Sequence, residues 1–333
     1  MRKRYWPTVK GKGASADYKE LFNNLTPCVP LSLIRRGGIG YVREAKPLFA
    51  RVAIKGVLKG IGLINNHMLK KRIITALCGI PLLIAVIWFG EPWFTILIAI
   101  WGLLAAFEFY KLVATSKVLP LTYFGLIWTL LFILSPHFDY ATLTPLLLTS
   151  AVMLSLIWLL LRRQKEGAFI GWAWTIGGIL YIGWLLSHFV TLRGLDEGRN
   201  WVFLALFTTF ASDTAAFFVG RALGKHHLAP RISPGKTWEG AIAGVFGAII
   251  VSLLFTLSTP LQLPLIHWQA ILLGLLVSVF GQLGDLVESL LKRNVGVKES
   301  GKLLPGHGGA LDRIDSVVFA GIVVYYYVIW AIQ

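Results

Sequence analysis

Long apolar segments alternate with short polar ones along most of the chain. From residue 73 onward the apolar residues come in blocks of about twenty, the length that an α-helix needs to cross a hydrocarbon core of ~30 Å. The pattern predicts spanning helices near 73–90, 93–110, 119–136, 142–161, 169–190, 201–219, 241–257, 268–290 and 314–332. We therefore expect an all-α fold, a polytopic integral membrane helix bundle with about nine transmembrane helices.

The composition agrees with a lipid bilayer as the surrounding solvent. Hydrophobic residues make up 56% of the chain and charged residues only 14%, whereas soluble proteins have roughly 25% charged residues. The net charge is +16, and a basic surface beside a membrane attracts anionic headgroups. No stacking platform or DNA-binding motif accompanies this charge, so we expect no nucleic-acid partner. Cys28 and Cys78 have no neighbouring partner and indicate neither a disulfide framework nor a zinc site.

Residues 1–67 differ from the rest of the chain. They hold thirteen Lys/Arg against three Asp/Glu and contain no long apolar run. Met68 is followed by a basic cluster and then by the first apolar segment, an arrangement typical of the start of a bacterial inner-membrane protein. We expect residues 1–67 to be a basic, non-spanning leader and Met68 to be the true start. A transit peptide and a basic arm on the membrane surface are the alternatives.

Basic residues follow alternate predicted helices, and this asymmetry predicts the orientation of the protein. Lys and Arg precede the first helix and follow the second, fourth, sixth and eighth. The segment after the fifth helix carries Arg193 and Arg199, offset by Asp196 and Glu197. The five basic segments are therefore expected on the cytoplasmic side of the bacterial inner (plasma) membrane, with the multi-pass chain ending on the opposite side.

Carboxylates are concentrated in the second half of the chain. We expect residues 68–200 to form an N-terminal set of transmembrane helices and residues 201–333 to form a C-terminal catalytic transmembrane region. A charged side chain at membrane depth costs at least ~2.5 kcal/mol on insertion scales, so it persists where it is paired, hydrated or used. Glu108 is the only internal carboxylate of the apolar half, and we expect it to matter less than the later ones.

Two pairs of carboxylates with the same spacing stand near the predicted eighth and ninth helices. Asp285 and Glu288 are three residues apart, as are Asp312 and Asp315, and this spacing places each pair on one helix face. Clustered oxygen ligands suit a hard cation such as Mg²⁺, so the pairs predict a metal site. The alternative is a set of helix-capping acids neutralised by nearby basic residues, here Lys292, Arg293 and Arg313.

The segment between those two helices is polar and rich in glycine, with Gly296, Gly301, Gly306, Gly308 and Gly309 beside Pro305 and His307. Glycine lets a backbone approach a ligand closely, and exposed N–H groups with Lys and Arg bind phosphate. We therefore interpret this segment as a phosphate cradle.

A second polar stretch covers residues 208–240. Asp213 lies inside an otherwise apolar helix, and Ser233-Pro234-Gly235-Lys236-Thr237 follows. Its end is similar to a P-loop, but Pro230 stands where that motif needs its first glycine. We reject the P-loop and expect a basic, hydroxyl-bearing loop for anionic phosphates, with His226 and His227 as surface residues.

Together these residues resemble the phosphatidate cytidylyltransferase, or CDP-diacylglycerol synthase, family. The resemblance covers roughly residue 68 to the end and is most specific over 205–320. Its motifs are the run from Asp213 through Ser233-Pro234-Gly235-Lys236-Thr237-Trp238-Glu239-Gly240, then Gly284-Asp285-Leu286-Val287-Glu288-Ser289, Lys292-Arg293, Lys298-Glu299, Pro305-Gly306-His307-Gly308-Gly309 and Asp312-Arg313-Ile314-Asp315. Glu299 replaces the usual Asp and Ala310 a larger aliphatic residue, and neither change removes an expected ligand.

The resemblance implies transfer of CMP from CTP to phosphatidate, giving CDP-diacylglycerol and pyrophosphate in phospholipid biosynthesis. It also implies Mg²⁺ with K⁺ as a second cation, and a homodimer. On this basis Asp285 and Asp312 hold the metal, with Asp315 and Asp213 as further ligands. The other expected catalytic residues are Lys292, Arg313 and His307, and the expected substrate-binding residues are Ser233, Lys236, Thr237, Arg293, Gly308 and Gly309.

Two other functions fit parts of the same sequence. A CTP-dependent lipid kinase of the polyprenol type also needs a metal and a basic loop. A transporter could use intramembrane acids, but many transporters contain paired repeats, and the sequence shows no such repeat.

Overall fold

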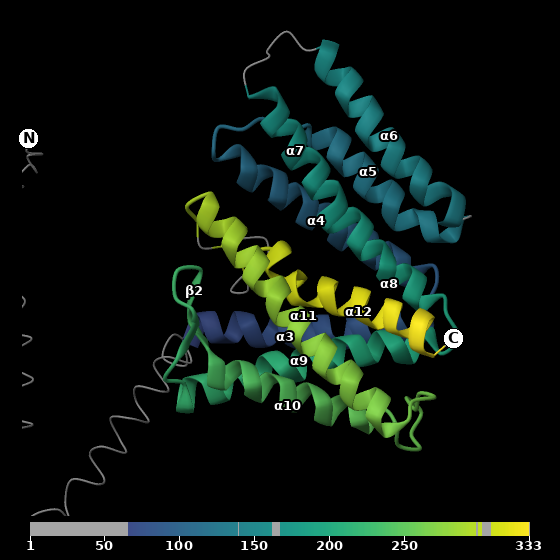
Figure 1. Ribbon diagram of the computed structural model, residues 1–333, viewed down its shortest axis with the longest axis vertical. Helices are drawn as coiled ribbons and strands as arrows, with labels where there is room; N and C mark the ends of the chain where they lie inside the picture. Colours follow the sequence, from purple (N-terminus) through teal and green to yellow (C-terminus); the bar gives the residue numbers. More distant parts are fainter. Residues whose placement is uncertain (1–65, 139, 162–166, 298, 302–307, 333) are drawn as a thin grey trace, which may run out of the picture. The chain divides into compact units, whose positions relative to one another are not determined.

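The computed structural model describes residues 66–138, 140–161, 167–297, 299–301 and 308–332 (Figure 1). Helix α3 (Asn66–Phe89) is the first described element and begins two residues before Met68. Residues 1–65 of the expected leader, the basic residues at 162–165 and His307 lie outside the described residues. The expectations that rest on them stay predictions.

The first half of the described chain is a series of apolar helices. After α3 come α4 (Trp93–Ala114), α5 (Thr122–Leu134) with the short turn η3 (Ser135–His137), and α6 (Tyr140–Leu161). The next helix is continuous from Ala168 to Arg193 and consists of α7 (Ala168–Gly178), a π-helical segment η4 (Ile179–Trp184) and α8 (Leu185–Arg193). Helix α4 packs against α5 and also contacts α3 and α8.

The second half contains α9 (Gly198–Leu223), α10 (Trp238–Leu254), α11 (His267–Asn294) and α12 (Asp315–Ala331), with the short turn η5 (Leu311–Arg313) before α12. Helix α10 packs against α9 and α11, and α12 packs against α11, α8 and α9 (Figure 1). This packing brings the later helices beside the end of the Ala168–Arg193 helix.

Each of the nine predicted apolar segments coincides with a helix among the described residues. Five helices are long and apolar enough to cross a membrane, namely Trp93–Ala114, Thr142–Leu161, Ala168–Arg193, Gly198–Leu223 and His267–Asn294. The other four apolar helices, Gly79–Phe89, Thr122–His137, Trp238–Leu254 and Asp315–Ala331, are shorter. The predominantly helical fold is therefore confirmed, whereas the number of nine crossings stays a prediction.

Large apolar side chains cover the outward faces of these helices. Leu160 is 81% exposed, Phe246 62% and Ile250 61%. Such a surface is unfavourable in water, but it is what hydrocarbon requires of a helix whose backbone groups are already paired. Together with the long apolar helices, this surface indicates a membrane protein.

One part of the all-α expectation was wrong. Residues between α9 and α10 form an antiparallel hairpin of β1 (His227–Ala229) and β2 (Ser233–Thr237), with His227 opposite Thr237. The stretch that we expected to be a phosphate-binding loop is therefore a strand. Thr237 also caps α10, because its hydroxyl accepts the N–H of Gly240 at 3.2 Å. His227 and the neighbouring His226 are exposed, as expected.

Candidate active site

A cavity of about 1320 Å³ lies among the described helices and has walls of two kinds. Its apolar walls come from α3, α4, α8 and α9 and include Ile84, Phe94, Leu206, Phe207 and Phe210. Its polar end comes from α9, the hairpin, α11, η5 and the start of α12. The charged lining residues are Asp213, Arg221, Lys236, Asp285, Asp312, Arg313 and Asp315. Among the described residues, the lining of the polar end thus contains four carboxylates and three cationic side chains.

Lys236 and Asp285 form the central ion pair of the polar end. The Lys236 Nζ lies 2.7 Å from Asp285 Oδ2, and both side chains keep contact with the cavity. Lys236 also donates to the backbone oxygen of Gln282 at 3.4 Å, and the Ser289 hydroxyl donates to Asp285 Oδ1 at 3.3 Å. The hairpin therefore carries its lysine onto α11, where an ammonium and a carboxylate face the same space.

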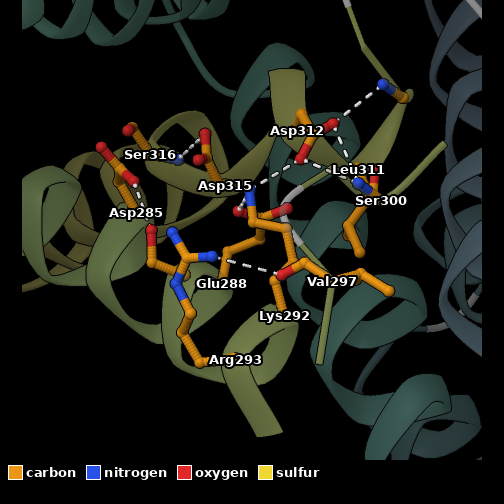
Figure 2. Close-up of polar contacts among 12 residues, drawn as sticks. Asp285, Glu288, Lys292, Arg293, Val297, Ser300, Leu311, Asp312, Asp315 and Ser316 are labelled. Carbon is orange, nitrogen blue, oxygen red and sulfur yellow. Dashed lines mark hydrogen bonds and ion pairs between the residues drawn. The ribbon is translucent and has the colours of Figure 1, made fainter. Parts of the chain in front are cut away.

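Asp213 and Asp315 complete the acidic lining from two other helices. Asp213 lies on α9, is exposed and lines the cavity. Asp315 is the first residue of α12, and its carboxylate accepts the N–H of Ser316 at 2.7 Å (Figure 2). Neither of these two carboxylates makes an ion pair among the described contacts, whereas Asp285 is paired with Lys236.

A second cluster of charged side chains lies beside the cavity, and in it two carboxylates share one ammonium. Lys292 contacts both Glu288, which is completely buried, and Asp312, whose Oδ1 is 2.7 Å from the lysine Nζ (Figure 2). Burial alone would raise the pKa of the Asp312 carboxyl. Hydrogen bonds with the Glu288 and Lys292 side chains and with the Gly309 amide outweigh burial and lower that pKa to about 2.

Asp312 also organises the segment that precedes it. Its carboxylate accepts the N–H of Gly309 at 2.9 Å and the N–H of Ser300 at 3.2 Å. Gly308 has a φ of +85°, which favours glycine, and a Cβ there would lie 2.7 Å from Asp312 Oδ2. Gly308 and Gly309 therefore let the backbone close around this carboxylate.

Arg293 ties the hairpin to the end of α11. Its Nε donates to the backbone oxygen of Ile232 at 3.1 Å, and its Nη1 donates to that of Val297 at 3.4 Å (Figure 2). The guanidinium thus holds two backbone segments together at an exposed position.

The structure brings together part of the predicted site. Among the predicted residues, those that line the cavity are Asp213, Lys236, Thr237, Asp285, Asp312, Arg313 and Asp315. Those described outside its lining are Ser233, Lys292, Arg293, Gly308 and Gly309. Lys292 was expected to bind phosphate, but its Nζ is held by two carboxylates.

The four predicted metal ligands, Asp213, Asp285, Asp312 and Asp315, all line the cavity, and their role as ligands stays a prediction. Within the described part of the chain no group of three or more His, Cys, Asp or Glu side chains is close enough to hold a metal ion by itself. The donors that line the cavity are nevertheless oxygens, which suit Mg²⁺, and this ion usually takes only one or two protein carboxylates and completes its shell with substrate phosphates and water. The residues fit an ion that binds with a phosphate ligand.

Sequence reasoning undervalued Glu108. This buried residue of α4 accepts the N–H of Leu311 at 3.0 Å and the hydroxyl of Ser300 at 3.2 Å. Glu108 therefore contacts the C-terminal region directly, and the expectation that it matters less than the later carboxylates stays a prediction. The only signal in the sequence was a carboxylate inside an apolar helix, which is costly unless paired.

The apolar helical body indicates a membrane protein, and the cavity that joins charged and apolar walls is its candidate active site. The sequence pattern of the cytidylyltransferase family matches residues 70–331. The phosphatidate cytidylyltransferase of Bacillus subtilis (strain 168) is 37% identical over 260 residues, which cover 75% of this chain and 94% of the relative. The enzyme of the same name from Brucella suis biovar 1 is 36% identical over 259 residues, 77% of this chain and 92% of the relative.

The phosphatidate cytidylyltransferase of Staphylococcus saprophyticus is 34% identical over 255 residues, covering 75% and 95% of the two chains. The chain therefore belongs to the cytidylyltransferase family and is a nucleotidyltransferase. This confirms the family resemblance drawn from the motifs.

Proposed function

We propose that this enzyme transfers the cytidylyl group of CTP to phosphatidate, giving CDP-diacylglycerol and pyrophosphate for phospholipid biosynthesis. The observation that carries the proposal is the two-part cavity, because phosphatidate is itself a phosphate joined to acyl chains. The names of the relatives support the identity of both substrates.

The dimensions of the cavity suit a lipid from one leaflet. Val202 and Asp213 both line it and are eleven residues apart on α9, which corresponds to roughly 16 Å along the helix. Half of a hydrocarbon core of ~30 Å is ~15 Å. The apolar part is therefore about as deep as one leaflet, so an acyl chain can lie there while its phosphate reaches the polar end.

The reaction requires no protein nucleophile. An ionised oxygen of phosphatidate attacks the α-phosphorus of CTP, a new P–O bond forms, and the bond to the β-phosphate oxygen breaks to release pyrophosphate. Two unit charges 4 Å apart repel by about 4 kcal/mol at an effective dielectric of 20. We assign Lys236, Arg221 and Arg313 to offset this repulsion, since all three line the polar end.

We also assign a divalent cation to the polar end, because carboxylates there would face the phosphates of two polyanions. Asp213 and Asp315 line this end without an ion pair among the described contacts. Asp285, Asp315 and Asp213 would hold Mg²⁺ together with the phosphates, while Asp312 shapes the site with Lys292. When bound, such an ion stabilises charge on transferred and departing phosphates.

The direct test uses purified protein in detergent with phosphatidate, Mg²⁺ and CTP labelled in separate reactions on cytidine or on the γ-phosphate. The proposal predicts that the cytidine label enters the lipid and that the γ-label leaves as pyrophosphate. Lipid that carries only the γ-label would instead identify a lipid kinase. Absence of label from the lipid in both reactions would contradict either kind of transfer.

We further propose nine crossings with the site on the cytoplasmic side. Asp285 is eighteen residues after His267, or roughly 27 Å along α11, so the site lies near one membrane surface.

Cysteine labelling tests this orientation at two exposed positions, Ser258 between α10 and α11 and Asn294 at the end of α11. In a background that lacks the two native cysteines, Ser258→Cys should react with an impermeant reagent outside intact cells and Asn294→Cys should not. The reverse result would overturn the orientation.

A further inference from the structure

Glu108 is a carboxylate in the middle of an otherwise apolar half of the protein, and the cytidylyl transfer proposed above does not use it. It is 7% exposed and lies on α4 with Phe109 and Tyr110, which are also buried. A carboxylate in such surroundings is costly unless polar groups satisfy it. Its partners therefore indicate why the chain keeps it there.

Those partners belong to the connection between α11 and η5. Glu108 Oε2 accepts the backbone N–H of Leu311, the first residue of η5, at 3.0 Å and the hydroxyl of Ser300 at 3.2 Å. The backbone N–H of the same Ser300 donates to Asp312. One carboxylate of α4 and one of η5 therefore hold Ser300 from two sides.

The backbone around Glu108 is shaped to admit its carboxylate. A Cβ on Gly309 would collide with Glu108 Oε2 and with the Ser300 hydroxyl, and a Cβ on Gly301 would collide with Glu108 Oε1. The close approach of the Glu108 carboxylate therefore requires glycine at both positions. Ser300, Gly301 and Gly309, which are described residues of the connection, thus pack closely around the α4 carboxylate.

Trp101 adds a second contact from the same helix. Its indole N–H donates to the backbone oxygen of Ala310 at 3.2 Å. Trp101 is seven residues, about two turns, before Glu108 and so lies on the same face of α4. Helix α4 therefore binds two successive residues, Ala310 and Leu311, immediately before Asp312 and Arg313 enter the cavity lining.

We infer that Glu108 is a positioning residue for the transfer reaction: it fixes the start of η5 so that Asp312 and Arg313 are correctly placed in the cavity. The inference rests on the proposed function. It assigns Glu108 no contact with substrate. A displacement of about 1 Å at a reacting group can reduce turnover roughly 10²-fold without abolishing substrate binding, so the effect belongs in kcat.

The test compares Glu108→Gln, which weakens the acceptor, with Glu108→Met, which removes it at similar volume. Turnover of cytidine-labelled CTP should fall about 10-fold for Gln and about 100-fold for Met, with KM for CTP and phosphatidate changed less than about threefold. Glu91→Gln makes the same chemical change in the turn before α4 and should leave turnover unchanged. A Gln variant with wild-type kcat, or with the loss confined to KM, would overturn the inference.

A double-mutant cycle with Ser300→Ala separates positioning from a general loss of folding. Ser300→Ala should lower kcat in the wild-type protein and should have a smaller effect in Glu108→Gln, because both changes weaken or remove the same contact. Additive losses would contradict the inference, and this holds even if Glu108→Met does not fold. A wild-type protein that does not transfer cytidine would instead contradict the proposed function, since the variants are read against that activity.

Discussion

The polar end of the cavity and the buried cluster beside it are built from carboxylates with the same sequence spacing. In the cavity, Asp285 pairs with Lys236, and Asp315 lines the open space with no ion pair among the described contacts. In the cluster, Glu288 and Asp312 share the ammonium of Lys292, and Asp312 accepts two backbone N–H groups as well. The difference teaches that the partners of a carboxylate, rather than its spacing, separate carboxylates available to a ligand from those that hold the scaffold.

The largest effect is expected from removing the Lys292 ammonium, which Glu288 and Asp312 share. Lys292→Met leaves Glu288 and Asp312 without their ammonium, and breaking a buried ion pair in this way costs about 3–5 kcal/mol. We expect little monodisperse protein, measured by size-exclusion chromatography in detergent, and a lower thermal unfolding midpoint.

Adding Asp312→Asn to Lys292→Met should restore part of the folded protein, because it removes the uncompensated charge. Lys225→Met, at an exposed position before the hairpin, is the matched control and should fold normally. Wild-type stability of Lys292→Met would show that the cluster is not a structural element.

The apolar part of the cavity can be shortened to test where the lipid lies. Leu206 is seven residues before Asp213, roughly 10 Å along α9, and Leu206→Trp adds bulk there. The ratio of kcat/KM for long-chain over short-chain phosphatidate should fall at least about 10-fold. Ile250→Trp, on an exposed face outside the cavity lining, should leave that ratio unchanged. Equal losses for both chain lengths in Leu206→Trp would place the acyl chains elsewhere.

Ser233 and Thr237 were both predicted to bind substrate, but we expect their removal to affect stability differently. Thr237→Val removes the cap of α10 and should lower stability by about 1 kcal/mol, visible as a lower unfolding midpoint. Ser233→Ala, which changes a residue outside the cavity lining, should leave stability and KM for CTP near wild type. A large rise in KM for Ser233→Ala would instead support the direct contact between Ser233 and phosphate that the sequence predicts.

Much of the fold was predictable because hydrophobic runs of helical length are a strong local signal, and all nine segments coincide with helices in the described chain. The hairpin was not predictable, since Pro234 and Gly235 are unfavourable in strands. Their strand is short and depends on its pairing with His227–Ala229.

The site was predictable in its residue types but not in its partners. Asp285 and Lys236 were identified individually, whereas their ion pair joins distant segments. The contact between Glu108 and Leu311 spans 203 positions, so no local pattern reports it. Lys292 shows the opposite error, because a basic residue beside a glycine-rich segment resembles a phosphate ligand until its two carboxylate partners are known.

The central claim is that the cavity carboxylates bring a divalent cation to the substrate phosphates. The most direct measurement is the Mg²⁺ dependence of turnover for Asp285→Asn and wild type, both monodisperse in detergent. Asp285→Asn keeps the size of the side chain and deletes one charge, so maximal turnover should fall at least ~10²-fold, with the Mg²⁺ curve shifted to higher concentration. Near-normal turnover with an unchanged Mg²⁺ curve would contradict the account, because Asp285 would then serve only as the ion-pair partner of Lys236.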